Sequence, residues 1–126
     1  RRLDFEAGEQ ALRKALEISP ESQETLLELV RHHLARAEWE RATTQDPSSS
    51  LASGRAALDR VLQVRPRLGE AIALRGALKL EGARGLQLPE RKLKAREAHQ
   101  DFSEAFALNG HLLDRWRAQD EQAQAL

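Results

Sequence analysis

A spaced set of apolar and small residues recurs along the chain, and this repetition constrains the fold more than any other feature. The first copy is Phe5, Gly8, Leu12, Ala15, Leu16, Ile18 and Pro20. The second copy, 46 residues further on, is Leu51, Gly54, Leu58, Val61, Leu62, Val64 and Pro66. The third, 44 residues later, is Ala95, Ala98, Phe102, Ala105, Phe106, Leu108 and Gly110. The spacing is that of one stripe of an α-helix, and the final proline or glycine stops each helix.

A different stripe lies between these helices and is also repeated. Leu26, Val30, Leu34 and Ala37 form its first copy, and Ile72, Gly76, Leu80 and Ala83 form the second, 46 residues later. Trp116 stands at the start of a third copy. These patterns predict an all-α fold of antiparallel helix-pair repeats, an α-solenoid of about six helices. We expect the helices at about 3–18, 22–44, 47–64, 68–83, 89–108 and 112–124.

The closing part of each repeat resembles the tetratricopeptide-repeat family. The pattern Ala-Leu-x-x-Ala-Leu-x-Ile-x-Pro at 11–20 is similar to the second half of such a repeat, 57–66 matches it well, and 101–110 matches it loosely. Family repeats have about 34 residues, so the resemblance implies helices that are lengthened here. We expect no long loop between about Ala37 and Ala52.

The resemblance implies a single helical repeat domain over 1–126. Residues 1–20 would be the second helix of a partial repeat, 21–66 and 67–110 two repeats, and 111–126 a truncated or capping helix. Because the chain starts at Arg1 instead of Met, we expect it to be a piece of a longer protein. Its Arg/Ala/Leu-rich style is similar to that of arrays in larger bacterial regulatory proteins such as Ser/Thr kinases.

Composition narrows the classes of partner. Lys and Arg together number 20, as do Asp and Glu, and aromatic residues make up 4%. Nucleic-acid binders usually carry a basic excess and stack bases on aromatic rings, so we expect no nucleic-acid partner. No apolar run approaches the length needed to span a bilayer, so we expect no membrane partner either. The lack of cysteine is typical of a cytoplasmic protein.

Arrays of helix pairs stack into a concave face, and the resemblance implies that this face binds a peptide or a partner protein. The side chains expected there lie just off the core stripes of the first helices: Glu24, Leu27, Glu28, Arg31, Glu70, Ala73, Ala77 and Glu81. Arg31 would be the main cation and would capture an acidic group. Two alternatives stay open. Arg31 pairs only with Glu28 or Glu24, or the module self-associates through its terminal helices.

Several residues that could carry chemistry have simpler structural readings. His32 and His33 point about 100° apart on a helix, so we expect a partly buried core residue at His33 and a solvated one at His32. A basic cluster could bind phosphate, although a solvated helix face explains it more simply: Arg91, Lys92, Lys94 and Arg96. Ser48–Ser50 suit helix capping. We therefore expect no enzyme activity, no catalytic residues, no metal and no cofactor.

The repeat register also predicts which residues form the core and where both tryptophan side chains pack. We expect Trp39 to pack against the lengthened part of the 47–64 helix, with an exposed anchor as the alternative. The expected core residues are Leu12, Leu16, Leu26, Leu34, Leu58, Leu62, Ile72, Leu80, Phe102, Phe106 and Trp116.

Overall fold

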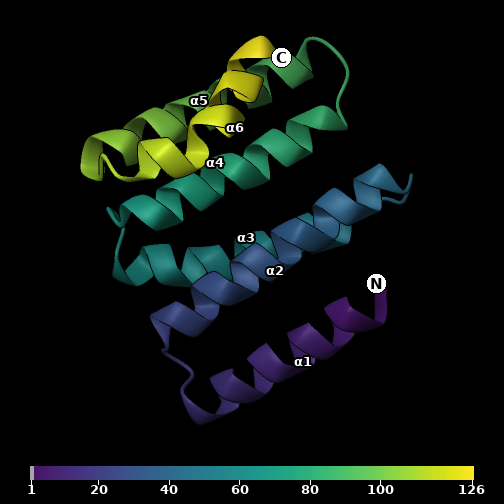
Figure 1. Cartoon of the computed structure of the whole chain (residues 1–126), viewed down its shortest axis with the longest axis vertical. Coiled ribbons are helices and arrows are strands. Elements are labelled where there is room, and N and C mark those ends of the chain that lie inside the picture. The colour runs from purple at the N-terminus through teal and green to yellow at the C-terminus, as the bar shows by residue number, and fades with distance from the viewer. Residues whose placement is uncertain (1) are drawn as a thin grey trace. The chain divides into compact units, whose positions relative to one another are not determined.

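The computed structural model describes residues 2–126, with side chains from Asp4 onward. Its six helices are α1 (Arg2–Ile18), α2 (Gln23–Ala42), α3 (Ser48–Val64), α4 (Gly69–Arg84), α5 (Glu90–Leu108) and α6 (Leu112–Ala125) (Figure 1). No strand occurs in the described part of the chain. The predicted all-α class is confirmed, and the helices begin and end within two residues of the predicted bounds.

The chain divides into two compact units, Arg1–Val64 with α1–α3 and Arg65–Leu126 with α4–α6. No described helix is both long enough and apolar enough to cross a bilayer.

In the first unit, α2 packs against both α1 and α3. The Ser22 hydroxyl caps α2 by accepting a hydrogen bond from the Thr25 backbone N–H at 3.2 Å. Only residues 43–47 separate α2 from α3, so the expectation of no long loop there is confirmed. Just before α3, the Asp46 carboxylate accepts a bond from the Ser48 backbone N–H at 3.0 Å, which satisfies a free donor of that helix end.

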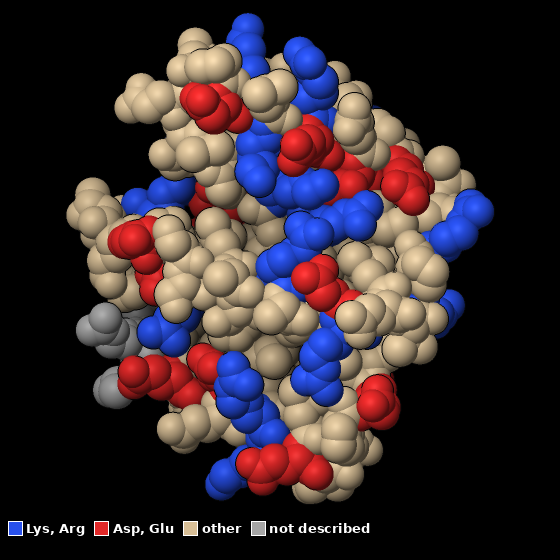
Figure 2. Space-filling model, turned by 180° about the vertical axis from the view of Figure 1, so that it is seen from behind, with Lys and Arg blue, Asp and Glu red and all other residues tan. Residues whose placement is uncertain are grey.

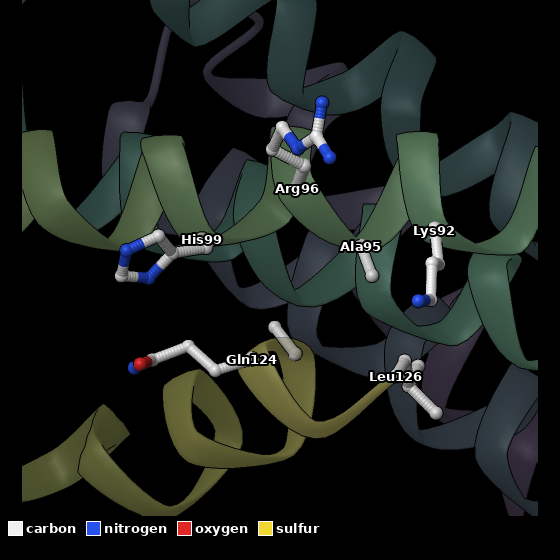
Figure 3. A pocket seen from close by; sticks show the side chains of 7 residues that line it. Lys92, Ala95, Arg96, His99, Gln124 and Leu126 are labelled. Atoms are coloured by element: carbon white, nitrogen blue, oxygen red, sulfur yellow. The ribbon is translucent and has the colours of Figure 1, made fainter.

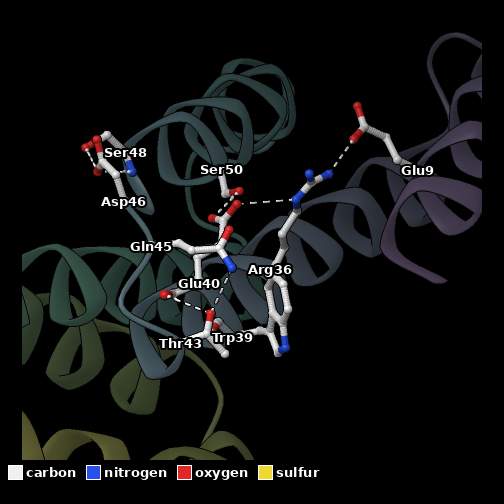
Figure 4. A network of polar contacts seen from close by, with 9 residues as sticks. All are labelled: Glu9, Arg36, Trp39, Glu40, Thr43, Gln45, Asp46, Ser48 and Ser50. Atoms are coloured by element: carbon white, nitrogen blue, oxygen red, sulfur yellow. Dashed lines mark hydrogen bonds and ion pairs between the residues drawn. The ribbon is translucent and has the colours of Figure 1, made fainter. Parts of the chain in front are cut away.

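A polar network joins the three helices of this unit (Figure 4). Arg36 on α2 lies 3.8 Å from a Glu9 carboxylate oxygen on α1 and 3.4 Å from a Glu40 oxygen. The buried Ser50 hydroxyl on α3 donates to Glu40 at 2.8 Å. The Glu40 carboxylate therefore contacts both Arg36 and Ser50. The Ser50 hydroxyl is buried but hydrogen-bonded, and its bond connects α3 to α2.

In the second unit, α4 packs against α5 and α6, which also pack against each other. Gly76 allows α4 and α5 to approach closely. A Cβ at this position would lie 3.1 Å from the Ala98 carbonyl oxygen and 3.3 Å from the Phe102 ring. The small residue in the α4 stripe is thus required by packing.

The predicted core is confirmed in part. Its buried members are Leu16, Leu26, Leu34, Leu58, Ile72, Leu80 and Phe102. The other four are only half-buried, against the prediction: Leu12, Leu62, Phe106 and Trp116. Leu12 and Leu62 belong to α1 and α3, each of which packs against one other helix, so part of the stripe on each meets solvent.

Trp39 packs against α1, a contact that the prediction of packing against the 47–64 helix did not include. Its ring lies 5.7 Å from the Phe5 ring of α1, between centroids. The last turns of α2 therefore bring Trp39 against α1, and its side chain is half-buried.

Candidate functional site

The face predicted on α2 is only partly a surface. Glu24 and Glu28 are exposed and Arg31 is half-buried, but Leu27 is buried. Arg31 forms an ion pair with Glu28 on its own helix, which is the open alternative for this residue. Leu27 is therefore not on the exposed face where it was expected, because α2 has packed neighbours on two sides and buries more than one stripe.

On α4 the predicted face is mostly covered as well. Glu70 is half-buried and lies 3.6 Å from Arg115, whereas Ala73, Ala77 and Glu81 are buried. The Glu81 carboxylate lies 3.3 Å from the Arg84 guanidinium. These three side chains do not supply the exposed surface that the prediction requires, since α4 also has two packed neighbours.

A pocket that the sequence analysis did not predict lies between α5 and α6 (Figure 3). Its volume is 380 Å³. The buried side chains of Ala95 and Ala123 supply small apolar walls, while the side chains at its rim are polar or charged. The lining residues are Lys92, Ala95, Arg96, His99, Ala123, Gln124 and Leu126.

The polar wall of the pocket is fixed by one carboxylate. His99 Nδ1 lies 2.7 Å from Asp120 Oδ1, and because a carboxylate oxygen accepts, Nδ1 is the donor. Gln124 Nε2 donates to the other Asp120 oxygen at 3.1 Å. Both oxygens of Asp120 thus accept a hydrogen bond. The bond from His99 joins α5 to α6 beside the pocket.

The predicted basic cluster separates into residues with different roles. Arg91 is structural, because its Nε donates to the Leu86 carbonyl at 3.0 Å in the turn after α4. Lys92 and Arg96 are exposed at the pocket, and Lys94 is half-buried outside it. Within residues 2–126, none of these last three has a hydrogen-bond or ion-pair partner. The sequence shows the cluster, but only the fold shows which cations stay unpaired.

The histidine pair of α2 lies in the first unit. His33 is 3% exposed and both of its ring nitrogens lack a partner. Burial lowers the pKa of His33, and the nearby Glu9 carboxylate opposes that effect. His32 is half-buried, against the expectation of a solvated side chain, because its ring packs edge-on against Phe5 at 5.7 Å between centroids. No group of three or more His, Cys, Asp or Glu among the described residues could hold a metal ion.

The serines before and within α3 serve the structure. Ser48 donates from its hydroxyl to Asp46 at 2.7 Å, and Ser50 donates to Glu40. The Asp46 carboxyl accepts from both the hydroxyl and the backbone of Ser48, and these bonds lower its pKa. The capping role expected for this segment is therefore what these contacts provide.

Comparisons with protein-family models, curated proteins and solved structures find no match to this chain. The tetratricopeptide-repeat resemblance accordingly stays a prediction.

Proposed function

We propose that this chain is a protein-interaction module, without enzyme activity of its own, that holds a peptide or partner protein at the α5–α6 pocket. One observation carries the proposal. Lys92 and Arg96 stand unpaired beside buried apolar walls in a pocket of 380 Å³. Small apolar walls inside a charged rim are the general anatomy of a protein-binding surface.

The size of the pocket suits part of a peptide. Sites that enclose ligands occupy roughly 300–1,000 Å³, so this pocket lies near the lower end of that range. Its alanine walls leave room for an incoming side chain without presenting bulky groups. A partner would therefore insert one or two side chains here and spread the rest of its contact over the exposed faces of α5 and α6.

The resemblance to the tetratricopeptide-repeat family supports the same class of function, since helix-pair arrays bind peptides and proteins on their helical faces. The originally predicted residues contribute less. Glu24 and Glu28 remain accessible to a partner, with Arg31 and Glu70 half-buried. Those residues are a weaker choice than the pocket, because Arg31 and Glu70 already form ion pairs.

A second candidate function is self-association, and it rests on exposed apolar side chains in the first unit. Ile18 at the end of α1 is 86% exposed, and Val64 at the end of α3 is 72% exposed. Large apolar side chains that lie in water can be covered by another copy.

Site-directed photo-crosslinking tests the main proposal. The chain contains no cysteine, so Gln124→Cys places a single thiol on the pocket rim for a benzophenone-maleimide label. Gln63→Cys, exposed on α3, is the matched control. With an extract of the source cells, we expect one partner protein attached through position 124 and absent at 63. The same adducts from both positions would contradict the proposal, and adducts of the chain with itself alone would favour self-association.

A further inference from the structure

We infer that the α5–α6 pocket takes an acidic peptide segment, in which a carboxylate side chain lies next to an apolar one. This inference rests on the proposed function and names the chemistry of its ligand.

The charge at the rim is the first argument. Lys92 and Arg96 are four residues apart on α5, so their backbone positions lie about one turn apart. Neither has an acidic partner in the described part of the chain, whereas Arg75 and Lys79 on α4 both pair with Asp101 at 2.9 Å. Each unpaired cation can attract a carboxylate, and the Arg96 guanidinium can bind both oxygens of one.

The carboxylate beside the pocket is already bonded to other groups. Asp120 on α6 accepts hydrogen bonds from His99 and Gln124. Figure 3 shows His99 and Gln124 at the opposite end of the pocket from Lys92. The cationic rim is therefore available to an external carboxylate, and the Asp120 cluster would repel a second negative charge placed there. The acidic group of the ligand is thus expected on the Lys92 and Arg96 side.

The orientation of the side chains divides the pocket further. Lys92 and Ala95 point from α5 toward α6, while the Arg96 guanidinium stands on the rim and is turned away from α6 (Figure 3). Ala95 and Ala123 are buried, so the space between them suits an apolar side chain. A ligand with one carboxylate near Lys92, a second near Arg96 and an adjacent apolar group matches all three features.

A peptide fits this surface better than a nucleic acid. The chain has no net charge, and the pocket lining contains no Phe, Tyr or Trp on which a base could stack. A phosphate backbone is normally bound by a larger excess of cations than two. The apolar walls formed by the alanines would not contribute to binding a phosphate, whereas they complement an aliphatic side chain.

Nuclear magnetic resonance titration of the ¹⁵N-labelled chain tests the inference. The probes are two acetylated and amidated tetrapeptides, Leu-Glu-Glu-Leu and its uncharged analogue Leu-Gln-Gln-Leu. We expect amide shifts within 92–99 and 119–126 for the acidic peptide, and at least about fivefold weaker binding of the analogue. Lys92→Gln combined with Arg96→Gln should weaken binding of the acidic peptide by a similar factor, while the control Lys94→Gln leaves it unchanged. None of the three side chains has a hydrogen-bond or ion-pair partner among the residues that the structure describes, so the variants should keep the melting temperature of the parent chain.

Each failure has a different meaning. Equal binding of both peptides at the same amides would overturn the acidic ligand and keep the pocket as a binding site. Equal weakening by Lys94→Gln would overturn the role of the paired cations. Stronger binding of oligouridylate than of the acidic peptide would overturn the peptide class. No shift at these amides with either peptide, together with no adduct at position 124, would contradict the proposed function itself.

Discussion

Among single residues, the buried polar side chains differ in whether they have partners. Asp101 and Glu81 have cations, and Ser50 has a carboxylate acceptor. His33 has neither ring nitrogen bonded. A buried group without a hydrogen bond costs stability, and the cost rises when the group becomes charged. His33 is therefore the residue at which pH acts most directly on the first unit.

Acidification should destabilise the first unit through His33. Its folded pKa lies below the ordinary 6.5 because of burial, so the unfolded chain binds the proton first as pH falls. Stability is then full above about pH 6.5 and decreases as pH drops through the folded value. The charged neighbours are Glu9 and Arg13 on α1 and His32 and Arg36 on α2, of which Glu9 opposes the shift and the others support it.

Urea denaturation between about pH 7.5 and pH 5.5 measures this effect. The His33→Leu variant should lose part of the decrease in midpoint that the parent chain shows, because it removes the proton-binding group. Glu9 does not mask the result, since its pKa is lowered: partial burial acts to raise it, but the Arg13 hydrogen bond and nearby positive charges outweigh burial. Identical pH profiles for the parent and the variant would contradict the assignment.

Among the helices, boundaries were predictable because they depend on local chemistry. Pro47 and Asp46 mark the start of α3, and Gly110 follows the end of α5, as turn and capping preferences require. It was harder to predict which faces of α2 and α4 are buried by neighbouring helices. Leu27 and Ala73 lie off the repeated stripe and are nevertheless buried, because burial depends on how many helices pack around α2 and α4.

The α5–α6 pocket could not be predicted from the sequence for a similar reason. The sequence shows Lys92 and Arg96 as two of several neighbouring cations, and nothing local distinguishes them from Arg91. The difference arises from contacts distant in sequence: Arg91 bonds to the turn after α4, whereas α6 brings Ala123 and Gln124 beside Lys92 and Arg96.

The α4–α5 pair should depend on the charge of Asp101. Its carboxylate accepts from the Arg75 guanidinium at 2.9 and 3.2 Å and lies 2.9 Å from Lys79 Nζ. Asp101→Asn keeps the shape but leaves two partly buried cations without their anion, so we expect a loss of about 1–3 kcal/mol in unfolding free energy. Chemical denaturation measures it.

Asp59→Asn is the matched control, because Asp59 pairs with Arg55 at 2.9 Å on the exposed side of α3. Surface pairs contribute about 0–1 kcal/mol, so this variant should lose less. Equal losses from the two variants would show that the Asp101 network adds no more than a surface ion pair.

Over the whole molecule, charge is balanced and mixed. Lys and Arg lie interspersed with Asp and Glu on the face drawn in Figure 2, in keeping with equal numbers of each sign. A charged ligand is therefore not selected by net charge. Local pairing is incomplete at the pocket rim of α5, which is where we propose that such a ligand binds.

Amide hydrogen exchange of the whole chain, with and without the partner recovered by crosslinking, tests the central claim most directly. It compares every candidate surface in one measurement. We predict slower exchange in the partner's presence for 92–99 and 119–126, and loss of that protection in the Lys92→Gln, Arg96→Gln double variant. Protection at 24–31, the face first predicted on α2, with exchange of α5 and α6 unchanged, would contradict the claim that the partner binds at the α5–α6 pocket.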